Sequence, residues 1–344
     1  MTEFIQLHLL TSYPPANLNR DDTGQPKTAT MGGVLRARIS SQSLKRAWRT
    51  SEVFTAPLAG HVGIRTKRFA EKLMIRLMAT GKKKKEAKNI ASKVAKIFAT
   101  VDKNTPPFTC QLVHLSPTEI AAIDAITERL VAGEKINPAD ELLLGGVERA
   151  ADIAMFGRML ADRREHSVEA AVQVAHAVTT HAVTIEDDYF TAIDDLKSRG
   201  EDAGASHIGE HEFVSGVFYL YLCIDRGLLL HNLDNNAALA GTALRALAES
   251  AVKIGPKGKQ ASFASRAYAS FVLAERGPQQ PRSLSIAFLK PTNGIDQLAT
   301  SIKALNGAWK SLDGAYGKCA EVRYMFNVHA GEGTLAELLD FVSG

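Results

Sequence analysis

The segment from Arg36 to Arg49 (RARISSQSLKRAWR) most constrains the fold, because it predicts a strand joined to a helix by a very short break. Arg36 and Arg38 lie at the end of the predicted strand, and Ser40 or Ser41 marks the break and caps the helix. At about 100° per residue, polar side chains fall on one side of this helix and apolar side chains on the other. The polar side holds Gln42, Lys45, Arg46 and Arg49, and the apolar side holds Leu44, Ala47 and Trp48.

The polar side of this helix is basic and has no acidic neighbours along the chain. No Asp or Glu occurs between Asp22 and Glu52. Cationic side chains beside serine hydroxyls and the free N–H groups of a helix start suit a run of phosphates. A solvated surface helix would show a similar pattern, so the residues alone leave both interpretations open. The cationic residues of this stretch are Lys27, Arg36, Arg38, Lys45, Arg46 and Arg49.

Charge is distributed unevenly along the chain. The 344 residues are 45% hydrophobic, which is enough for one large globular domain or two ordinary ones. Residues 1–100 carry a balance of +13 and the remainder a balance of −9. This asymmetry favours an anionic partner for the basic portion and would let copies of the chain attract one another head to tail.

The sequence predicts neither a membrane partner nor a cofactor. Apolar runs stay well short of the ~18 residues that a membrane span requires, and the start lacks the basic segment of a secretory signal, so the cytoplasm is the expected location. Cys110, Cys223 and Cys319 lie far apart without a C-x-x-C pair, which argues against a disulfide framework or a zinc site. The glycine-rich turn 255–260 lacks the spacing of a nucleotide triphosphate loop, although its backbone N–H groups could hold a phosphate.

The order of predicted elements indicates an α+β fold. Pro14-Pro15 is expected to end the first strand, and residues 14–35 are expected to form a long loop. The order of strand, helix, insertions, strand, helix and strand is compatible with a ferredoxin-like palm of the modified RRM type. The predicted strands are 4–13, 212–225, 268–274, 284–289 and 322–328, and the predicted helices are 41–54, 62–100, 139–161, 168–180, 235–253, 295–309 and one from 334.

Two stretches are predicted to interrupt this palm. Residues 55–150 have the pattern of a helical insertion, and residues 183–211 have the polar composition of a protruding hairpin that carries Phe190 as an isolated aromatic. The basic run Lys82–Lys85 follows Gly81 at a helix junction. This run is either a plain solvated face or a secondary contact with a target duplex.

Seven sequence blocks, spread over most of the chain and weakest between residues 55 and 150, support a family resemblance. The blocks are Leu18–Asp22, Gly32-Gly33, Arg38–Arg46, Gly157–Met159, Ala175–His181, Asp187–Leu196 and Glu212–Tyr219. In this order they resemble the CasC (Cse4) family, the repeated backbone subunit of the type I-E CRISPR surveillance complex, Cascade.

The resemblance implies a fold and a function. Residues 1–344 would form one RRM-like palm domain, with 55–150 as its fingers and 183–211 as its thumb, which reaches over the guide strand. The protein would be non-catalytic and would oligomerise in a helical filament along the CRISPR guide RNA. Its partners would be this RNA, complementary target DNA, further copies of itself and other Cascade subunits. Base pairing would then read the sequence while the protein holds the backbone.

The predicted RNA-binding residues supply charge, hydrogen bonds or contacts with bases. The resemblance gives Met159 the role of packing against guide bases, which Phe190 and Thr191 would bracket. The predicted set is Asn19, Arg20, Lys27, Arg38, Ser40, Gln42, Lys45, Arg46, Arg49, Arg158, Met159, Phe190, Thr191, Lys257, Lys259 and Gln260.

A metal-dependent nuclease acting on RNA or DNA is the alternative function. It would use His176 and His181 with the carboxylate pairs Asp187-Asp188 or Asp194-Asp195. The two histidines are five residues apart, not the four that bring two imidazoles together on one helix face. Adjacent carboxylates also point apart in a helix or a strand. The sequence therefore argues against this alternative.

Overall fold

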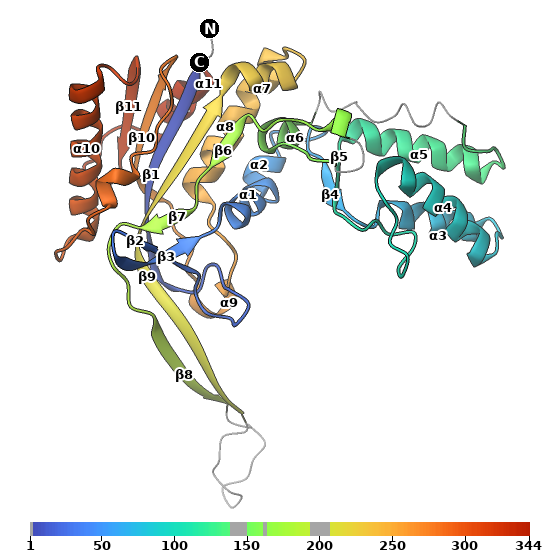
Figure 1. Ribbon diagram of the computed structural model, residues 1–344, viewed down its shortest axis with the longest axis horizontal. Coiled ribbons are helices and arrows are strands. Elements are labelled where there is room, and N and C mark those ends of the chain that lie inside the picture. Colours follow the sequence, from blue (N-terminus) through green and yellow to red (C-terminus); the bar gives the residue numbers. More distant parts are fainter. Residues whose placement is uncertain (1–2, 138–149, 161–163, 193–206) are drawn as a thin grey trace, which may run out of the picture.

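A twisted antiparallel sheet forms the centre of the computed structural model, which describes residues 3–137, 150–160, 164–192 and 207–344 (Figure 1). Among these residues nine strands join the sheet in the order β11-β10-β1-β9-β7-β3-β2, and β6 and β8 also pair with β9. The central strand β1 pairs antiparallel with β9 on one side and with β10 on the other. The strands are β1 (Phe4–Ala16), β2 (Thr28–Met31), β3 (Val34–Ile39), β6 (Val172–Val174), β7 (Ala177–Thr179), β8 (Glu186–Ala192), β9 (His207–Asp225), β10 (Ala269–Gly277) and β11 (Val322–Asn327).

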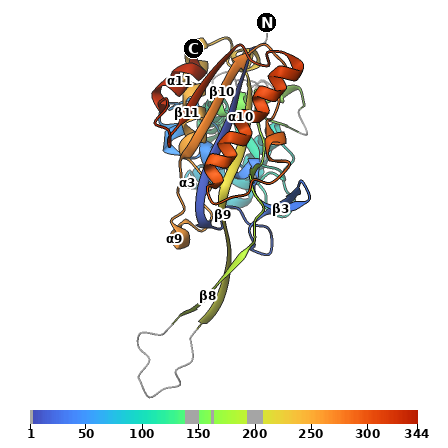
Figure 2. The same cartoon turned by 90° about the vertical axis from the view of Figure 1, so that its left-hand side faces the viewer.

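Helices cover both faces of the sheet. Successive residues of a strand point to opposite sides, and both sides of the central strands carry apolar residues that the helices bury. Leu9 packs on the face that α1, α8 and α11 cover, whereas Leu10 packs with Phe288 and Leu305 on the face that α10 covers. Figure 2 shows α10 lying across the sheet. The helices of this body are α1 (Ser41–Arg49), α2 (Glu52–Thr55), α6 (Ala151–Phe156), α7 (Arg226–Asn232), α8 (Ala237–Lys253), α9 (Gln260–Phe263), α10 (Gln297–Tyr316) and α11 (Leu335–Ser343), with short 3-10 turns at η2 (Arg164–His166) and η3 (Ser285–Phe288).

The predicted insertion at 55–150 is a lateral unit with its own apolar core (Figure 1). Its helices α3 (Phe69–Ala79), α4 (Lys84–Phe98) and α5 (Pro117–Val131) stand beside a two-stranded sheet of β4 (Ile64–Thr66) and β5 (Val113–Leu115). Residues 138–149 lie outside the described residues. Lys82–Lys85 spans the junction of α3 and α4, as its position after Gly81 predicted.

A long hairpin of β8 and β9 extends away from the sheet (Figure 1). Phe190 faces Gly209 across the hairpin, and a Cβ on Gly209 would lie 2.2 Å from the Phe190 ring. Glycine at this position therefore makes room for the aromatic ring. The hairpin overlaps the segment 183–211 that the sequence singled out, of which residues 193–206, including Asp194-Asp195, lie outside the described part of the chain.

The structure overturns two of the predicted elements and shortens two others. Residues 64–66, inside the predicted helix 62–100, form β4, and of the predicted helix 139–161 only α6 is helical within the described residues. Residues 168–180 are not a helix, because β6 and β7 pair with β9, and β7 also pairs with β3. Residues 284–289 are not a strand, because η3 turns there and buries Leu284 and Phe288 against the sheet.

The region after the first predicted strand also differs from the expectation. Pro14-Pro15 does not end β1, which continues to Ala16 through a shift in its pairing with β9. The predicted loop 14–35 contains β2 and the start of β3, and Gly32 and Gly33 form their two-residue turn. Both glycines have positive φ, at 61° and 79°, as a hairpin turn of this length favours.

Two of the predicted helices are confirmed, 41–54 and 235–253. The helix 41–54 is present as α1 and α2, separated at Thr50 and Ser51. Asn236 caps α8, where its side chain accepts a hydrogen bond from the N–H of Leu239. None of the helices in the described ranges combines the length and the apolar character needed to cross a membrane.

Candidate nucleic-acid interface

Helix α1 is fixed at its start and along its buried side. The Ser40 hydroxyl accepts a hydrogen bond from the N–H of Ser43 at 3.3 Å, and the N–H of Ser40 donates to Oδ1 of Asn19 at 2.8 Å. Trp48 is fully buried, and its indole N–H donates to the carbonyl of Ile254 at 3.0 Å. Asn19 and Ser40 therefore hold the helix in place through their side chains.

The outward side of α1 lies between two grooves. The first, of about 740 Å³, lies toward the lateral unit and is lined by Gln42, Lys45, Arg46 and Arg49 together with Arg65 and Met159. The second, of about 760 Å³, is lined by Arg20, Asp21, Asp22, Arg46 and Lys257. Arg46 is exposed and borders both grooves. The predicted polar row of α1, Gln42, Lys45, Arg46 and Arg49, thus forms a ridge between the two grooves, and we refer to this row as the ridge.

Cationic side chains also crowd the start of α1. Partial burial, and then the nearby charge of Arg65, lowers the pKa of Lys45. Burial, followed by the charges of Arg38, Lys27 and Lys45, lowers the pKa of His176. Neighbouring cations add to the effect of burial at both groups, and a bound polyanion would offset this charge.

The loop after α8 brings further predicted residues to the second groove. Lys257 is exposed on its wall, whereas Nζ of Lys259 lies 3.4 Å from Nε2 of His211 at the base of the β8–β9 hairpin. The side-chain amide of Gln260 donates to Pro256 O and Ser265 Oγ, at 3.3 and 3.0 Å. Gln260 therefore shapes this loop from inside it.

Two arginines that looked available in the sequence are internal. Arg36 is fully buried and donates to the carbonyls of Thr179 and Phe288 at 3.0 and 2.8 Å. Arg158 donates from Nη1 to both carboxylate oxygens of Glu119, at 2.9 and 2.7 Å, and its side chain is 1% exposed. Arg158 is therefore not placed to grip a phosphate and instead ties the segment after α6 to α5.

Met159, the neighbour of Arg158, points the other way. Its side chain is 81% exposed at the first groove. Gly157 ends α6 with a φ of 75°, and a Cβ there would lie 3.0 Å from Val168 O. Gly157 thus allows the tight backbone turn, the buried Arg158 anchors this segment to α5, and Met159 projects into the first groove.

Arg49 has an acidic partner that local sequence did not reveal. Its Nη1 lies 3.4 Å from Oδ2 of Asp152, which also accepts a hydrogen bond from Nε2 of His114 at 2.8 Å. Oδ1 of Asp152 accepts from the N–H of Gly63 at 2.8 Å. Asp152 therefore neutralises part of the α1 charge and joins α1 to the lateral unit.

Phe190 and Thr191 of the β8–β9 hairpin do not lie at the first groove, where Met159 is exposed. Phe190 stacks on His211 with ring centroids 4.5 Å apart, and Thr191 beside it is exposed. Both lie on β8, which Figure 1 shows well away from α1 and α6, whereas Met159 lines the first groove beside α1. A bracket built from all three residues therefore cannot form within one copy of the chain.

The residues of the alternative nuclease site are dispersed. Nδ1 of His176 accepts from the N–H of Ser41, whereas Nε2 of His181 accepts from the N–H of Val217. Asp187 and Asp188 are exposed neighbours on β8. Across the described residues no group of three metal-ligating side chains gathers.

Arg65 and His176 lie beside the cations of α1, although sequence reasoning did not include them in the candidate site. Arg65 lies in the lateral unit, and only the pairing of β4 with β5 and the docking of that unit bring it beside Lys45. His176 drew attention only as a metal ligand. No local signal identifies either residue, because their neighbours are distant in the sequence.

Comparison with known proteins gives a consistent result. The sequence model of the family described as CT1975-like protein matches residues 5–339. A chain of a solved "CRISPR RNA-guided surveillance complex, pre-nicking" is 29% identical, with 99% of each chain covered and a TM-score of 0.82. A chain of a second "CRISPR RNA-guided surveillance complex" is 25% identical, again with 99% of each chain covered, and has a TM-score of 0.72. No curated protein matches the sequence.

These full-length matches agree with the order of motifs along the chain and with its mixed helix and antiparallel sheet architecture. The chain therefore belongs to the CT1975-like protein family, in agreement with the CasC (Cse4) resemblance of its sequence.

Proposed function

We propose that this protein is a non-catalytic subunit of a CRISPR surveillance complex that binds guide RNA and assembles along it in antiviral defence. The observation that carries this proposal is the cationic ridge of α1 between two grooves. Lys45 and Arg46 project there beside Arg20, Arg65 and Lys257. Two adjacent channels with cations along their shared wall suit a continuous chain of phosphates better than a single small ligand.

The RNA backbone would lie along α1, and its bases would face outward for pairing with complementary target DNA. Cations along the ridge contact phosphates, which carry no sequence information, so recognition of a target belongs to base pairing. The exposed Met159 beside the same ridge offers an apolar surface to a base. Arg158 supports the interface by anchoring this methionine and does not itself contact RNA.

The palm in this proposal is ferredoxin-like. The strand order β10-β1-β9-β7, with α1 in the connection that follows β1 and α8 in the connection from β9 to β10, has the arrangement expected of that fold. The lateral unit of α3, α4 and α5 corresponds to the fingers, and the β8–β9 hairpin corresponds to the thumb. β11 and α10 are additions at the far edge of the sheet.

Assembly follows from the position of the thumb. Because β8 lies well away from α6 and the first groove, the thumb of one copy would reach the RNA held by the next. Opposite charge at the two ends of the sequence favours this head-to-tail order.

The experiment is a salt titration of RNA binding by the double variant Lys45→Ala with Arg46→Ala. We choose Arg46 over Arg49 because removal of Arg49 would leave buried Asp152 without that partner. Affinity is expected to fall for every RNA sequence, and each lost phosphate contact should reduce the slope of log affinity against log salt by about 0.7. The matched control is Lys303→Ala with Lys318→Ala, which removes two exposed lysines from α10 and the segment after it.

A slope that stays the same in the ridge variant would contradict the proposal, as would an equal loss in the control. Sequencing of the nucleic acid that co-purifies with the wild-type protein supplies the second test, with repeat-spacer guide RNA as the expected result. A cleavage assay with and without chelator tests the nuclease alternative. Within the described residues no cluster of metal-ligating side chains favours that alternative.

A further inference from the structure

His176 lies at the start of the cationic ridge and has a defined ring orientation. Its Nδ1 accepts a hydrogen bond from the N–H of Ser41 at 3.1 Å, and Nη1 of Arg38 lies 3.4 Å from the same nitrogen. The backbone on either side is fixed, since Ala175 N–H donates to Tyr221 O and Ala177 pairs with Ile39. The imidazole therefore keeps one edge against α1.

These contacts select one tautomer. A backbone N–H and a guanidinium can only donate, so Nδ1 must be the unprotonated acceptor nitrogen. The single proton of a neutral imidazole then resides on Nε2. His176 is exposed, and no hydrogen-bond partner of Nε2 occurs within the described residues. The ring thus offers an N–H donor to whatever occupies the ridge.

The surroundings also disfavour the charged form of this ring. A second proton would have to bind at Nδ1, where it would face the Ser41 N–H and the Arg38 guanidinium. The charged groups that act on the ring are Arg38 from β3, Lys27 from the loop before β2 and Lys45 from α1, and all three are cations. Together with partial burial they lower the pKa of His176 below its ordinary value.

We propose that His176 is a phosphate-binding residue of the RNA interface that acts as a neutral Nε2–H donor. This inference rests on the proposed RNA-binding function and assigns a role to a residue that neither motif nor charge selects. A neutral donor adds a directed hydrogen bond to a phosphate oxygen without adding charge. It therefore contributes affinity but releases no counterion.

A crossed pair of variants separates this role from a purely structural one. In His176→Asn the side-chain oxygen replaces Nδ1 and still accepts from Ser41, but the Nε2 donor is lost. In His176→Gln the amide nitrogen takes the place of Nε2, but the acceptor for Ser41 is lost. Binding is measured on an RNA oligonucleotide short enough to hold one copy. We expect His176→Asn to weaken binding about tenfold and His176→Gln to retain most of the wild-type affinity.

Salt and pH supply readouts that a structural defect would not reproduce. The salt slope of His176→Asn should equal that of the wild-type protein, whereas Lys45→Ala with Arg46→Ala lowers it. A charged imidazole would bind phosphate more tightly than a neutral one, so the affinity ratio of wild type to His176→Asn should not rise as the pH is lowered from about 8 toward the ordinary histidine pKa of about 6.5. His329→Gln is the matched control. His329 follows the edge strand β11, far along the sheet from β7, which follows His176 in the chain.

Nitrogen NMR of the labelled wild-type protein tests the tautomer without any variant. Protonated Nε2 and unprotonated Nδ1 are expected, with a change at Nε2 when RNA binds. The inference is overturned if His176→Asn binds as well as the wild type, if His176→Gln loses more than His176→Asn, or if the ring is doubly protonated. If the ridge variant also binds RNA normally, the proposed function itself fails, so the two failures are distinguishable.

Discussion

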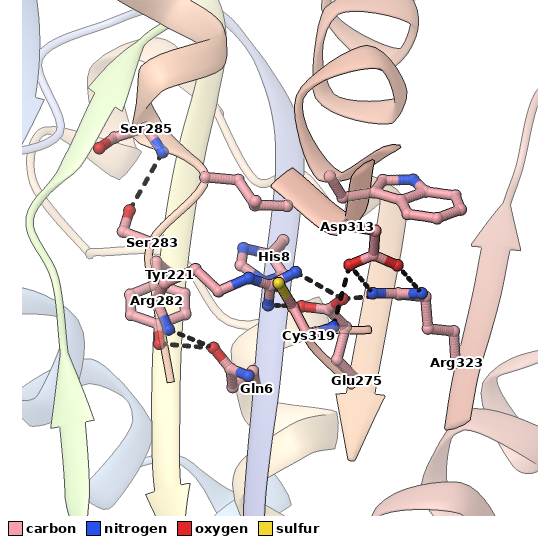
Figure 3. A network of polar contacts seen from close by, with 12 residues as sticks. Gln6, His8, Tyr221, Glu275, Arg282, Ser283, Ser285, Asp313, Cys319 and Arg323 are labelled. Atoms are coloured by element: carbon pink, nitrogen blue, oxygen red, sulfur yellow. Dashed lines mark hydrogen bonds and ion pairs between the residues drawn. The ribbon is translucent and has the colours of Figure 1, made fainter. Parts of the chain in front are cut away.

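Glu275 is a fully buried carboxylate that three side chains share (Figure 3). Nε2 of His8 lies 3.2 Å from it, Arg323 donates to Oε1 at 2.7 Å, and Arg282 contacts both of its oxygens. Tyr219 lies 2.9 Å from the other nitrogen of His8. This network connects β1, β9, β10 and β11 beneath α10, and it lies apart from the proposed RNA interface, so it can be tested through stability alone.

Replacement of Glu275 by Gln should destabilise the protein strongly. The variant leaves Arg282 and Arg323 facing a neutral amide in a buried place, and loss of one partner of a buried ion pair costs on the order of 3 kcal/mol. Urea denaturation measures the change in the free energy of unfolding. Glu128→Gln is the matched control, because its pair with Arg76 is exposed and should contribute no more than about 1 kcal/mol.

The pH dependence of stability checks the cause of that effect. Burial acts to raise the pKa of Glu275, but hydrogen bonds from His8, Arg282 and Arg323 outweigh it and hold the pKa far below its ordinary value. A carboxyl with a lowered pKa stabilises the fold fully above the unfolded value of about 4.3, and this stabilisation is lost as the pH falls below it. Below about pH 4.5 the wild type should therefore lose stability more steeply than Glu275→Gln, and equal slopes would contradict the assignment.

At the scale of elements, Asp152 joins three parts of the chain. It accepts hydrogen bonds from Gly63 at the entry to β4 and from His114 on β5, and it pairs with Arg49 on α1. Burial acts to raise the pKa of Asp152, but the hydrogen bond and charge of His114, then Gly63 and Arg49, outweigh it, so the pKa is lowered. Together with the Arg158–Glu119 pair, this carboxylate ties the lateral unit to α1 and α6 beside the first groove.

Asp152→Asn should loosen this joint. The amide nitrogen of Asn would face one of the donors that Asp152 now accepts, leaving a buried contact unmade. Amide hydrogen exchange in residues 61–66 and 113–115 is expected to become faster, and RNA affinity is expected to fall although no ridge cation has changed. Asp124→Asn, an exposed site on α5, is the control. Unchanged exchange at β4 and β5 would show that Asp152 does not hold the joint.

Local signals explain which elements the sequence predicted. Sequence alone located α1 and α8. The serine cap and the amphipathic period of α1 and the Asn236 cap of α8 depend on residues close together in the sequence. The stretch 168–180 was predicted wrongly because its strands are decided by distant partners, such as Val172 with Ile224 and Ala177 with Ile39. Tertiary pairing there overrides the local pattern.

The candidate site divides in the same way. The predicted ridge residues Gln42, Lys45, Arg46 and Arg49 do lie together, because one helix carries them. The internal positions of Arg36 and Arg158 were not foreseen, since their partners Phe288 and Glu119 are far away in the sequence. The roles of Asp152 and His176 depend on contacts across 103 and 135 residues. Sequence patterns identify charged residues well but do not show which of them are paired inside the fold.

At the scale of the whole molecule, the thumb tests whether copies assemble along RNA. Asp187 and Glu212 face each other in the hairpin register, so an Asn-Gly turn between them can replace residues 188–211 without disturbing the part of β9 within the sheet. The shortened protein keeps the α1 ridge. We therefore expect it to bind a short RNA that holds one copy with nearly wild-type affinity.

On longer RNA the two proteins should differ, because each thumb would act on the RNA held by the neighbouring copy. Sedimentation of complexes on RNAs of increasing length should show the wild type adding copies in regular steps, while the shortened protein binds without cooperativity. Raising the salt should weaken assembly of the wild type, since opposite ends of the chain attract across contacts that ions screen. If the shortened protein assembles in the same steps, contact between copies resides in the palm and fingers, and the thumb has another role. If neither protein assembles at low salt, the head-to-tail arrangement itself is wrong, whatever the affinity of a single copy for RNA.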